Sequence, residues 1–314
     1  MTETLRIATR ESQLALWQAN YIRDLLMASH PSIKVELVPM TTRGDQLLHA
    51  PLAKIGGKGL FIKELEKAML DGRADLAAHS LKDVPMELPE GFCLAAVTER
   101  AEPRDALVAG SYRSLADIPH GSVIGSSSLR RQIQIRDRRP DLVFRDLRGN
   151  VNTRLAKLDK GEYDAIILAS CGLQRLGMAE RISARLDTED CLPAAGQAVV
   201  GIECREGDQR VMDLLAAINH SPTQQIIEAE RRLCLRLQAS CQLPIAAYAE
   251  YLQPETDPDS SSRMRLSAFV SDLEGKNQLR VIKEDLIRNR LALADEVAEA
   301  LFAKGAKEII AGIV

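Results

Sequence analysis

Apolar and polar positions along the chain follow two periods, one typical of buried strands and one typical of amphipathic helices. Over residues 12–28, Leu14, Trp17, Tyr21 and Leu25 recur on one helical stripe. This alternation of short apolar runs and helical stripes restarts near residue 122. Strands are predicted at 5–9, 34–40, 74–79, 92–98, 105–110, 122–125, 142–146 and 164–170, with helices at 12–28, 60–72, 126–137 and 151–162. Strands that alternate with helices predict α/β domains with parallel or mixed sheets.

The last third of the chain has a different order of elements. A long helix is predicted over 221–240, with Pro222 in its first turn and its end near Gln238 or Ala239. Three strand-like runs follow at 245–252, 264–270 and 278–284, and a helix over 291–305 closes the chain. Grouped strands followed by a helix predict a small α+β domain.

The length of 314 residues exceeds one ordinary core and predicts two or three domains. The segments near residues 100 and 197 have the composition of crossings between two α/β lobes. The predicted domains are therefore 1–98 with 199–218, then 99–198, and finally 219–314. A chain that leaves one lobe and later returns to it forms a two-stranded hinge, which suits a ligand cleft.

Composition narrows the class of protein. With 46% hydrophobic and 27% charged residues, the chain has the composition of a soluble globular protein. A net charge of −3 excludes a globally basic nucleic-acid binder. The first residues lack the apolar region of a signal peptide, so a cytoplasmic location with reduced cysteines is expected. The cysteines lack the CxxC spacing that is typical of a structural zinc site, so no metal site is predicted.

An arginine-rich segment is the strongest candidate for chemistry. Residues 130–154 contain eight arginines, three aspartates and no lysine. Such a run is often only a solvated helix face. However, the planar guanidinium group suits bidentate binding of carboxylate or phosphate. Ser126, Ser127 and Ser128 precede it at a strand-to-helix turn, where hydroxyls and unpaired backbone N–H groups bind anions.

Three further segments contain candidate site residues. Arg10 and Ser12 stand at a similar turn in the first lobe, although Ser12 alone is most simply a helix N-cap. Asp83, in HSLKDVP, follows a buried strand, the position where α/β active sites gather, but it is equally a plain turn residue. The glycine-rich segment 41–61 is either a linker or a mobile basic lid.

Cys241, in ASCQLPI, has no local sign of an activated nucleophile. It follows a helix C-terminus, whose partial negative charge disfavours a thiolate. From its surroundings alone, it is interpreted as a buried thiol.

The motifs HSLKDVP, GSSSLRRQ, RGNVNTRL, GQAVVGIE and CQLPI occur in this order. As an ordered set, they resemble porphobilinogen deaminase, the hydroxymethylbilane synthase family of tetrapyrrole and haem biosynthesis. The resemblance implies two lobes of the type-II periplasmic-binding-protein kind around a cleft, plus the small α+β domain. It also implies a cytoplasmic, monomeric transferase without nucleic-acid, membrane or metal partners.

The implied reaction starts from a dipyrromethane cofactor held through a thioether on Cys241. Porphobilinogen loses ammonia to give an azafulvene, and the terminal pyrrole attacks it. After four additions, hydrolysis releases hydroxymethylbilane. Each pyrrole unit carries an acetate and a propionate, and buried carboxylates must be paired.

The resemblance assigns a role to each matching residue. Asp83 is implied as the catalytic carboxylate, and the implied mobile loop contains Lys54, Lys58 and Phe61. The implied cofactor-binding residues are Cys241, Lys82, Asp83, Ser128, Arg130, Arg131, Ser80, Gly172 and Asp45. The implied substrate-binding residues are Arg10, Ser12, Gln18, Arg148, Asn150, Arg154, Arg175 and Gln197.

Four positions depart from the family pattern, which has glycine where this chain has Ala198, Ala239, Ser240 and Ala246. If those positions require a positive φ, strain or altered turns are expected there.

Two alternatives stay open at this stage. A bilobal binder of a small anion would explain the lobes and arginines, but not Asp83 together with Cys241. A nucleic-acid binder using residues 130–154 would show binding that falls steeply with salt.

Overall fold

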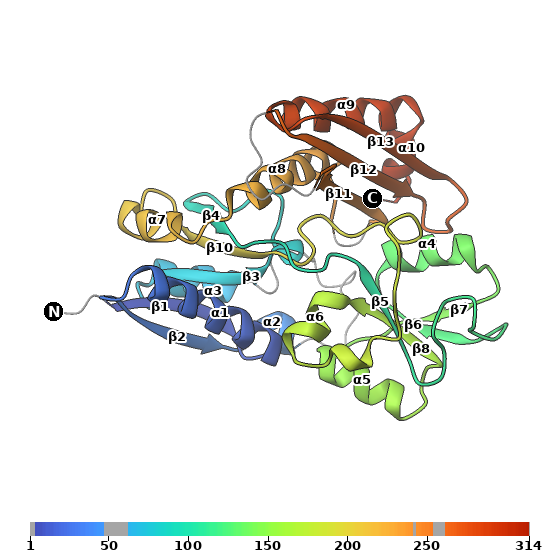
Figure 1. The fold of residues 1–314 in the computed structure, drawn as a ribbon, viewed down its shortest axis with the longest axis horizontal. Helices are drawn as coiled ribbons and strands as arrows, with labels where there is room; N and C mark the ends of the chain where they lie inside the picture. The colour runs from blue at the N-terminus through green and yellow to red at the C-terminus, as the bar shows by residue number, and fades with distance from the viewer. Residues whose placement is uncertain (1–3, 47–61, 241–242, 254–260, 314) are drawn as a thin grey trace. The chain divides into compact units, whose positions relative to one another are not determined.

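The computed structural model describes residues 4–46, 62–240, 243–253 and 261–313. The chain divides into two compact units (Figure 1). Unit 1 comprises Met1–Ala101 and Ala198–Gln224, and unit 2 comprises Glu102–Gln197 and Gln225–Val314. Unit 1 is therefore discontinuous in sequence.

The sheet of unit 1 has five strands in the order β2-β1-β3-β10-β4. Strands β1, β2 and β3 are parallel, whereas β10 runs antiparallel to both of its neighbours. The elements are β1 Thr4–Arg10, α1 Gln13–Ser29, β2 Lys34–Met40, α2 Arg43–Gln46, α3 Lys63–Leu70, β3 Leu76–Ser80, η2 Leu81–Asp83, β4 Phe92–Val97, β10 Val200–Arg205 and α7 Gln209–Ala216.

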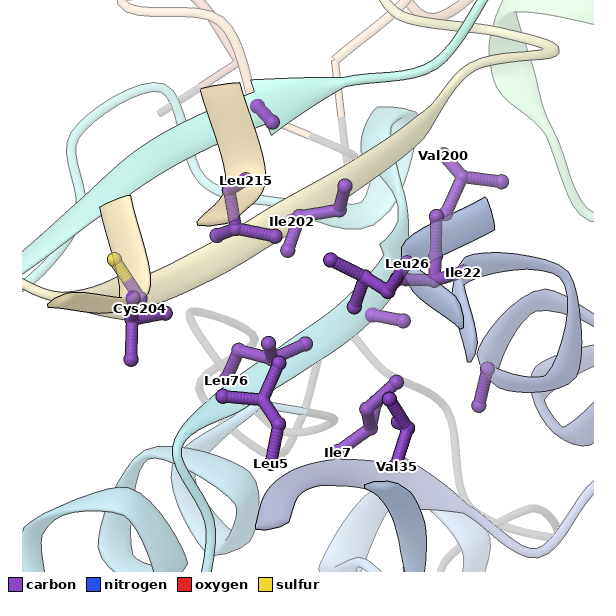
Figure 2. Packing of buried hydrophobic residues seen from close by; sticks show 14 of the residues in the cluster. Leu5, Ile7, Ile22, Leu26, Val35, Leu76, Val200, Ile202, Cys204 and Leu215 are labelled. Carbon is purple, nitrogen blue, oxygen red and sulfur yellow. The ribbon is translucent and has the colours of Figure 1, made fainter. Parts of the chain in front are cut away.

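Two apolar clusters cover the two faces of this sheet, because successive strand side chains point to opposite sides. One cluster packs Leu5 and Ile7 of β1 against Ile22 and Leu26 of α1, and Leu215 of α7 joins the same cluster (Figure 2). The other places Ala8 and Ala77 beneath Leu65 and Met69 of α3. Helices on both faces hold the strand ends in fixed positions.

The five-stranded sheet of unit 2 repeats this connection pattern, with the order β7-β6-β8-β5-β9. Here β6 takes the place of β1, and the antiparallel β5 takes the place of β10. The elements are β5 Asp105–Ala109, β6 Val123–Gly125, α4 Leu129–Arg138, β7 Val143–Arg145, α5 Val151–Asp159, β8 Ala165–Ala169, α6 Ser170–Arg175, η3 Ala179–Arg181 and β9 Ala184–Arg185.

The rest of unit 2 contains a three-stranded antiparallel sheet, β11-β12-β13, with helices. A small cluster joins Ile133 and Leu192 to Ala246, Tyr248 and Phe269 of this sheet. The elements are α8 Ser221–Arg236, whose first four residues belong to unit 1, β11 Ile245–Tyr251, β12 Arg263–Ser271, β13 Gln278–Leu286, η4 Ile287–Asn289, α9 Arg290–Ala303 and α10 Ala306–Ala311.

The predicted fold class, mixed α/β lobes with a small α+β C-terminal part, is confirmed. Three details differ from the prediction. Helix α8 ends at Arg236 rather than near Gln238. The segment after Gln197 was interpreted as a crossing, but it continues as β10 inside the first sheet. Helices α2, α6, α7 and α10 were not predicted. In the described part of the chain, no helix is long and apolar enough to span a membrane.

Candidate functional site

The predicted site residues gather at one kind of place, the carboxyl end of a parallel strand. Ligands of open α/β sheets bind at this edge. In unit 1, the ends of β1, β2 and β3 hold Arg10, Asp45 and Ser80–Asp83. In unit 2, the segments after β6, β7 and β8 hold Ser128, Arg148 and Arg175.

Arg10 is the last residue of β1, and its side chain reaches the segment after β2. Its Nε donates to Asp45 Oδ2 at 3.1 Å, and a second guanidinium nitrogen pairs with Oδ1. The Thr42 hydroxyl also donates to Asp45, at 2.7 Å. Burial alone would raise the pKa of Asp45, but these hydrogen bonds outweigh it and the pKa is lowered. These two residues, predicted separately, are therefore brought together, and the carboxylate of Asp45 is ionised.

Two other predicted residues of unit 1 also meet. Gln18 of α1 is buried, and its amide donates to Ser80 Oγ, at the end of β3, at 2.7 Å. Ser12 is the N-cap of α1 and accepts from the Ala15 N–H at 3.3 Å. The simple capping interpretation of Ser12 is thus confirmed, whatever else it binds.

Asp83 ends the 3₁₀ turn η2 directly after β3. Its side chain is exposed, and the neighbouring Lys82 is half-buried. Val84 has the extended conformation (φ −81°, ψ 128°) that the following Pro85 favours, and its backbone N–H closes the turn onto Leu81. The turn therefore presents a carboxylate to solvent at the strand edge.

The serine turn of unit 2 is held by its own hydroxyls. Ser128 is the N-cap of α4 and accepts from the Arg131 N–H at 3.5 Å. Ser127 Oγ donates to the Leu147 carbonyl at 3.0 Å and accepts from the Leu147 N–H at 2.9 Å. Leu147 directly precedes Arg148. The end of β6 is thus tied to the segment after β7.

Arg130 and Arg131 do not lie on a solvated helix face, because both are buried. They share one carboxylate, that of Asp105, at the start of the antiparallel β5. Arg130 pairs with Oδ2 at 2.9 Å, and Arg131 pairs with Oδ1 at 2.7 Å. The pKa of Arg131 is raised, because attraction by Asp105 outweighs the burial that would lower it.

Asp105 accepts two further hydrogen bonds. The Gln197 amide donates to Oδ1 at 2.9 Å, and the Cys191 thiol donates to Oδ2 at 3.4 Å. Burial, followed by the charge of Asp105, raises the pKa of Cys191 to about 12, so this thiol is neutral. Asp105 was predicted only as part of a strand. An aspartate at the start of a buried strand was the signal that could have indicated its role, since a buried carboxylate requires charged or hydrogen-bonding partners.

The segment after β7 is shaped by Gly149. Its φ is +115°, and a Cβ there would lie 2.7 Å from the side chain of Thr153. Asn150 caps α5 by accepting from the Thr153 N–H at 2.9 Å. Arg154 Nε donates to the Gly149 carbonyl at 2.7 Å, so this predicted arginine also supports the turn. Arg148 is half-buried beside it.

Helix α6 places Gly172 and Arg175 after β8. Gly172 is buried and Arg175 is half-buried. Ser170, the first residue of α6, is buried, and its hydroxyl has no partner among the described residues. The same holds for Arg131 Nε, although Arg131 also contacts β8 through a hydrogen bond to the Ile167 carbonyl at 3.3 Å. Two buried donors next to β8 therefore have unused capacity.

Four predicted residues, Cys241, Lys54, Lys58 and Phe61, lie outside the described residues. The flanks of Cys241 are defined. Gln238 has a φ of +50°, while Ala239 and Gln238 donate to the Cys234 and Leu235 carbonyls at 2.8 and 3.0 Å. This is a Schellman ending of α8, a motif that normally uses glycine at the position of Gln238.

The positions where the family has glycine differ in conformation. Ala198 has a φ of +71°, so strain is present there. Ala239 and Ser240 are not among the described residues with positive φ, and Ala246 lies inside β11. The expected strain is therefore found at Ala198. Before Cys241, the positive φ occurs at Gln238, one residue before Ala239.

Comparison with known proteins decides the family. The family model "Porphobilinogen deaminase, dipyromethane cofactor binding domain" matches residues 5–213, and "Porphobilinogen deaminase, C-terminal domain" matches residues 224–303. The chain belongs to the porphobilinogen deaminase family. Its activity is that of a hydroxymethylbilane synthase, a transferase of tetrapyrrole biosynthesis that acts on porphobilinogen and uses a dipyrromethane cofactor.

Solved structures with a similar chain trace include several binding proteins. The Methionine Binding Protein MetQ has 13% identity, covers 68% of this chain and 89% of its own, and gives a TM-score of 0.45. A putative methionine-binding lipoprotein from Bacillus subtilis has 13% identity, covers 71% and 92%, and gives 0.44. The VFT2 domain of Bordetella pertussis BvgS has 15% identity, covers 72% and 93%, and gives 0.41.

The donor set in unit 2 fits the carboxylates of a dipyrromethane. Arg130 and Arg131 place two cationic groups on one carboxylate, and Arg131 Nε and Ser170 Oγ remain as buried donors. Such an excess of buried positive charge and free donors suits an anionic ligand. The anion site around the serine turn stays a prediction.

Proposed function

We propose that Cys241 is the covalent anchor of the dipyrromethane cofactor and that Asp83 is the catalytic carboxylate. Further residues bind the cofactor or the growing chain. For the cofactor, these residues are Ser80, Lys82, Ser128, Arg130, Arg131, Gly172 and Asp45. For the substrate, they are Arg10, Ser12, Gln18, Arg148, Asn150, Arg154, Arg175 and Gln197. The observation that carries this proposal is the buried pairing of Arg130 and Arg131 on the one carboxylate of Asp105.

Asp83 has the placement that the role needs. It stands at the carboxyl end of β3 with an exposed carboxylate and the half-buried Lys82 beside it. When bound, the cofactor supplies the nucleophilic pyrrole carbon that starts the chain. The Asp83 oxygens accept hydrogen bonds from pyrrole N–H groups. They also stabilise the positive charge that develops as porphobilinogen loses ammonia.

The arginines orient the substrate by its carboxylates. Arg148 and Arg154 flank the Gly149 turn, and Arg175 ends α6. A guanidinium binds a carboxylate in bidentate fashion, which fixes direction as well as position. Arg10 is held by Asp45, which fixes the orientation of its guanidinium group at the end of β1.

The remaining features of the proposal come from the family likeness and the composition. We propose three domains, 1–98 with 199–218, 99–198 and 219–314. We also propose a mobile loop with Lys54, Lys58 and Phe61. The working form is a cytoplasmic monomer that acts on small molecules and not on nucleic acid or membranes.

The anchor is tested by the intact mass of the denatured protein. Wild type and a Cys234→Ser variant should both carry the extra mass of two linked pyrrole units, whereas Cys241→Ser should not. Cys234 is the matched control because it is a buried thiol close by in sequence. Samples that show bare polypeptide mass are incubated with porphobilinogen and measured again. Persistent absence of the adduct in wild type would refute the anchor.

The catalytic carboxylate is tested separately. Asp83→Ala should retain the circular dichroism spectrum of wild type but lose nearly all turnover of porphobilinogen, because an exposed turn residue contributes little to folding. Glu87→Ala, an exposed acid on the same segment, is the control and should keep its activity. Normal turnover by Asp83→Ala would remove Asp83 from the mechanism.

A further inference from the structure

Two cysteines of unit 1 face each other across adjacent strands. Cys93 lies in β4 and Cys204 in β10, and they are register partners in the antiparallel pairing. Their sulfur atoms are 3.7 Å apart. No step of the reaction uses either thiol.

The backbone at this pair is compatible with a disulfide. Opposed residues of antiparallel strands have Cα atoms roughly 4.5–5.5 Å apart, within the range of about 4.4–6.8 Å that disulfides span. Bond formation brings the sulfurs from 3.7 Å to a bonding distance of about 2.05 Å. The strand pairing shifts register between Ile202 and Glu203, which leaves Ala95 of β4 as an extra residue two positions after Cys93.

The two thiols differ in their access to solvent. Cys204 is fully buried in the apolar cluster that also contains Leu76 and Leu215, and Figure 2 shows its sulfur pointing toward a helix. Burial and the neighbouring Cys93 raise the pKa of Cys204 to about 12. Cys93 is half-buried, so it is the thiol that a reagent in solution meets first.

We propose that Cys93 and Cys204 form a reversible intramolecular disulfide when the protein meets a peroxide. The Cys93 sulfur attacks hydrogen peroxide, the O–O bond breaks, and a sulfenic acid and one water result. The Cys204 sulfur then attacks the sulfenic sulfur, which releases a second water and closes the S–S bond. The two thiols lose two electrons and two protons, and the peroxide is reduced.

The bond would join the two separate pieces of unit 1. Cys93 belongs to Met1–Ala101 and Cys204 to Ala198–Gln224, and they are 111 residues apart. A cross-link across so long a loop restricts the unfolded chain strongly. The pair is remote from the candidate site, since Cys204 aligns with Leu76 at the start of β3 while Asp83 follows its end. Oxidation should therefore stabilise unit 1 without stopping the reaction.

The same geometry predicts that the bond is easily reduced. Opposed Cβ atoms in a sheet are roughly 4.5–5.5 Å apart, at or beyond the upper end of the usual disulfide range of about 3.5–4.5 Å. Strain of this kind makes a disulfide a labile one.

The test uses the cofactor-loaded protein treated with hydrogen peroxide. The protein is then denatured, alkylated with N-ethylmaleimide and mapped by mass spectrometry after proteolysis. The expected product has lost two hydrogens, joins the Cys93 and Cys204 peptides, and reverts with dithiothreitol. Cys93→Ser and Cys204→Ser should each lack it, while Cys234→Ser, another buried thiol, should retain it.

A second readout is independent of the mapping. Trp17, the single tryptophan, lies in α1 of unit 1, so its fluorescence reports the unfolding of this unit. The urea midpoint should rise on oxidation in wild type and stay unchanged in Cys93→Ser. Three outcomes would overturn the proposal: alkylation of both thiols after peroxide, over-oxidation of Cys93 with Cys204 still free, or pairing of either with another cysteine.

Discussion

The buried carboxylate of Asp105 is the sharpest place to test the electrostatics of unit 2. Its Oδ1 accepts from Arg131 and Gln197, and its Oδ2 accepts from Arg130 and Cys191. In Asp105→Asn, whichever position the NH₂ group takes, it faces donors rather than an acceptor. The variant also leaves two buried guanidinium groups without this counter-charge.

The expected cost follows from these contacts. Removing one partner of a buried ion pair typically costs about 3–5 kcal/mol, because the remaining charge stays buried. Asp105 serves two arginines at 2.9 and 2.7 Å, so we expect a loss of about 3–5 kcal/mol in the unfolding free energy of cofactor-free protein. Bound cofactor carboxylates should replace part of the missing charge, so cofactor-loaded Asp105→Asn should lose less.

The assay is urea unfolding followed by circular dichroism, with cofactor-free and cofactor-loaded samples of each variant. Asp159→Asn is the matched control, because Asp159 pairs with Arg181 at the surface of the same unit. Such exposed pairs contribute about 0–1 kcal/mol. A loss for Asp105→Asn as small as that for Asp159→Asn would refute the buried-charge argument. Equal losses with and without cofactor would refute the proposed contact between the arginines and the cofactor.

Two backbone predictions follow from positive φ angles. Ala198→Gly should stabilise the protein by about 0.5–1 kcal/mol, since relief of about 1–2 kcal/mol of left-handed strain exceeds the entropy cost of glycine. Ala195→Gly, in the same turn and without a positive φ, should destabilise it instead, and thermal unfolding compares the two. Gly149→Ala should lower the unfolding free energy by about 2–4 kcal/mol, because the backbone is strained for alanine and the new Cβ overlaps Thr153. A melting temperature equal to that of wild type would contradict the close approach of Gly149 to Thr153.

Much of the fold could be predicted because local pattern and tertiary structure agree. The strand and helix periods, the cap at Ser12 and the extended Val84 before Pro85 all depend on neighbours in sequence. Strand β10 was missed as part of the first sheet, because its partners β3 and β4 are more than one hundred residues earlier in the chain.

The candidate site was predictable in position but not in partnership. Arginine spacing indicated an anion site, yet nothing local to Arg130 shows that it and Arg131 are buried on Asp105, some 25 residues earlier in the sequence. Likewise, the sequence raised the question of strain at Ala198, and only the backbone shows that its φ is positive. Contacts between distant segments depend on the packed structure, which no periodicity encodes.

The two five-stranded sheets share one connection pattern, and residues of opposite charge stand at one matching position in it. In both five-stranded sheets, the third parallel strand is followed at once by a helical turn, η2 in unit 1 and α6 in unit 2. The first turn ends in the carboxylate of Asp83, whereas the second ends in the guanidinium of Arg175. The fold therefore fixes where a functional side chain stands, and the residue type decides the sign of its charge. Under the proposed roles, a reaction that develops positive charge on a substrate rich in carboxylates needs both signs, and these two matching turns supply a carboxylate in unit 1 and a guanidinium in unit 2.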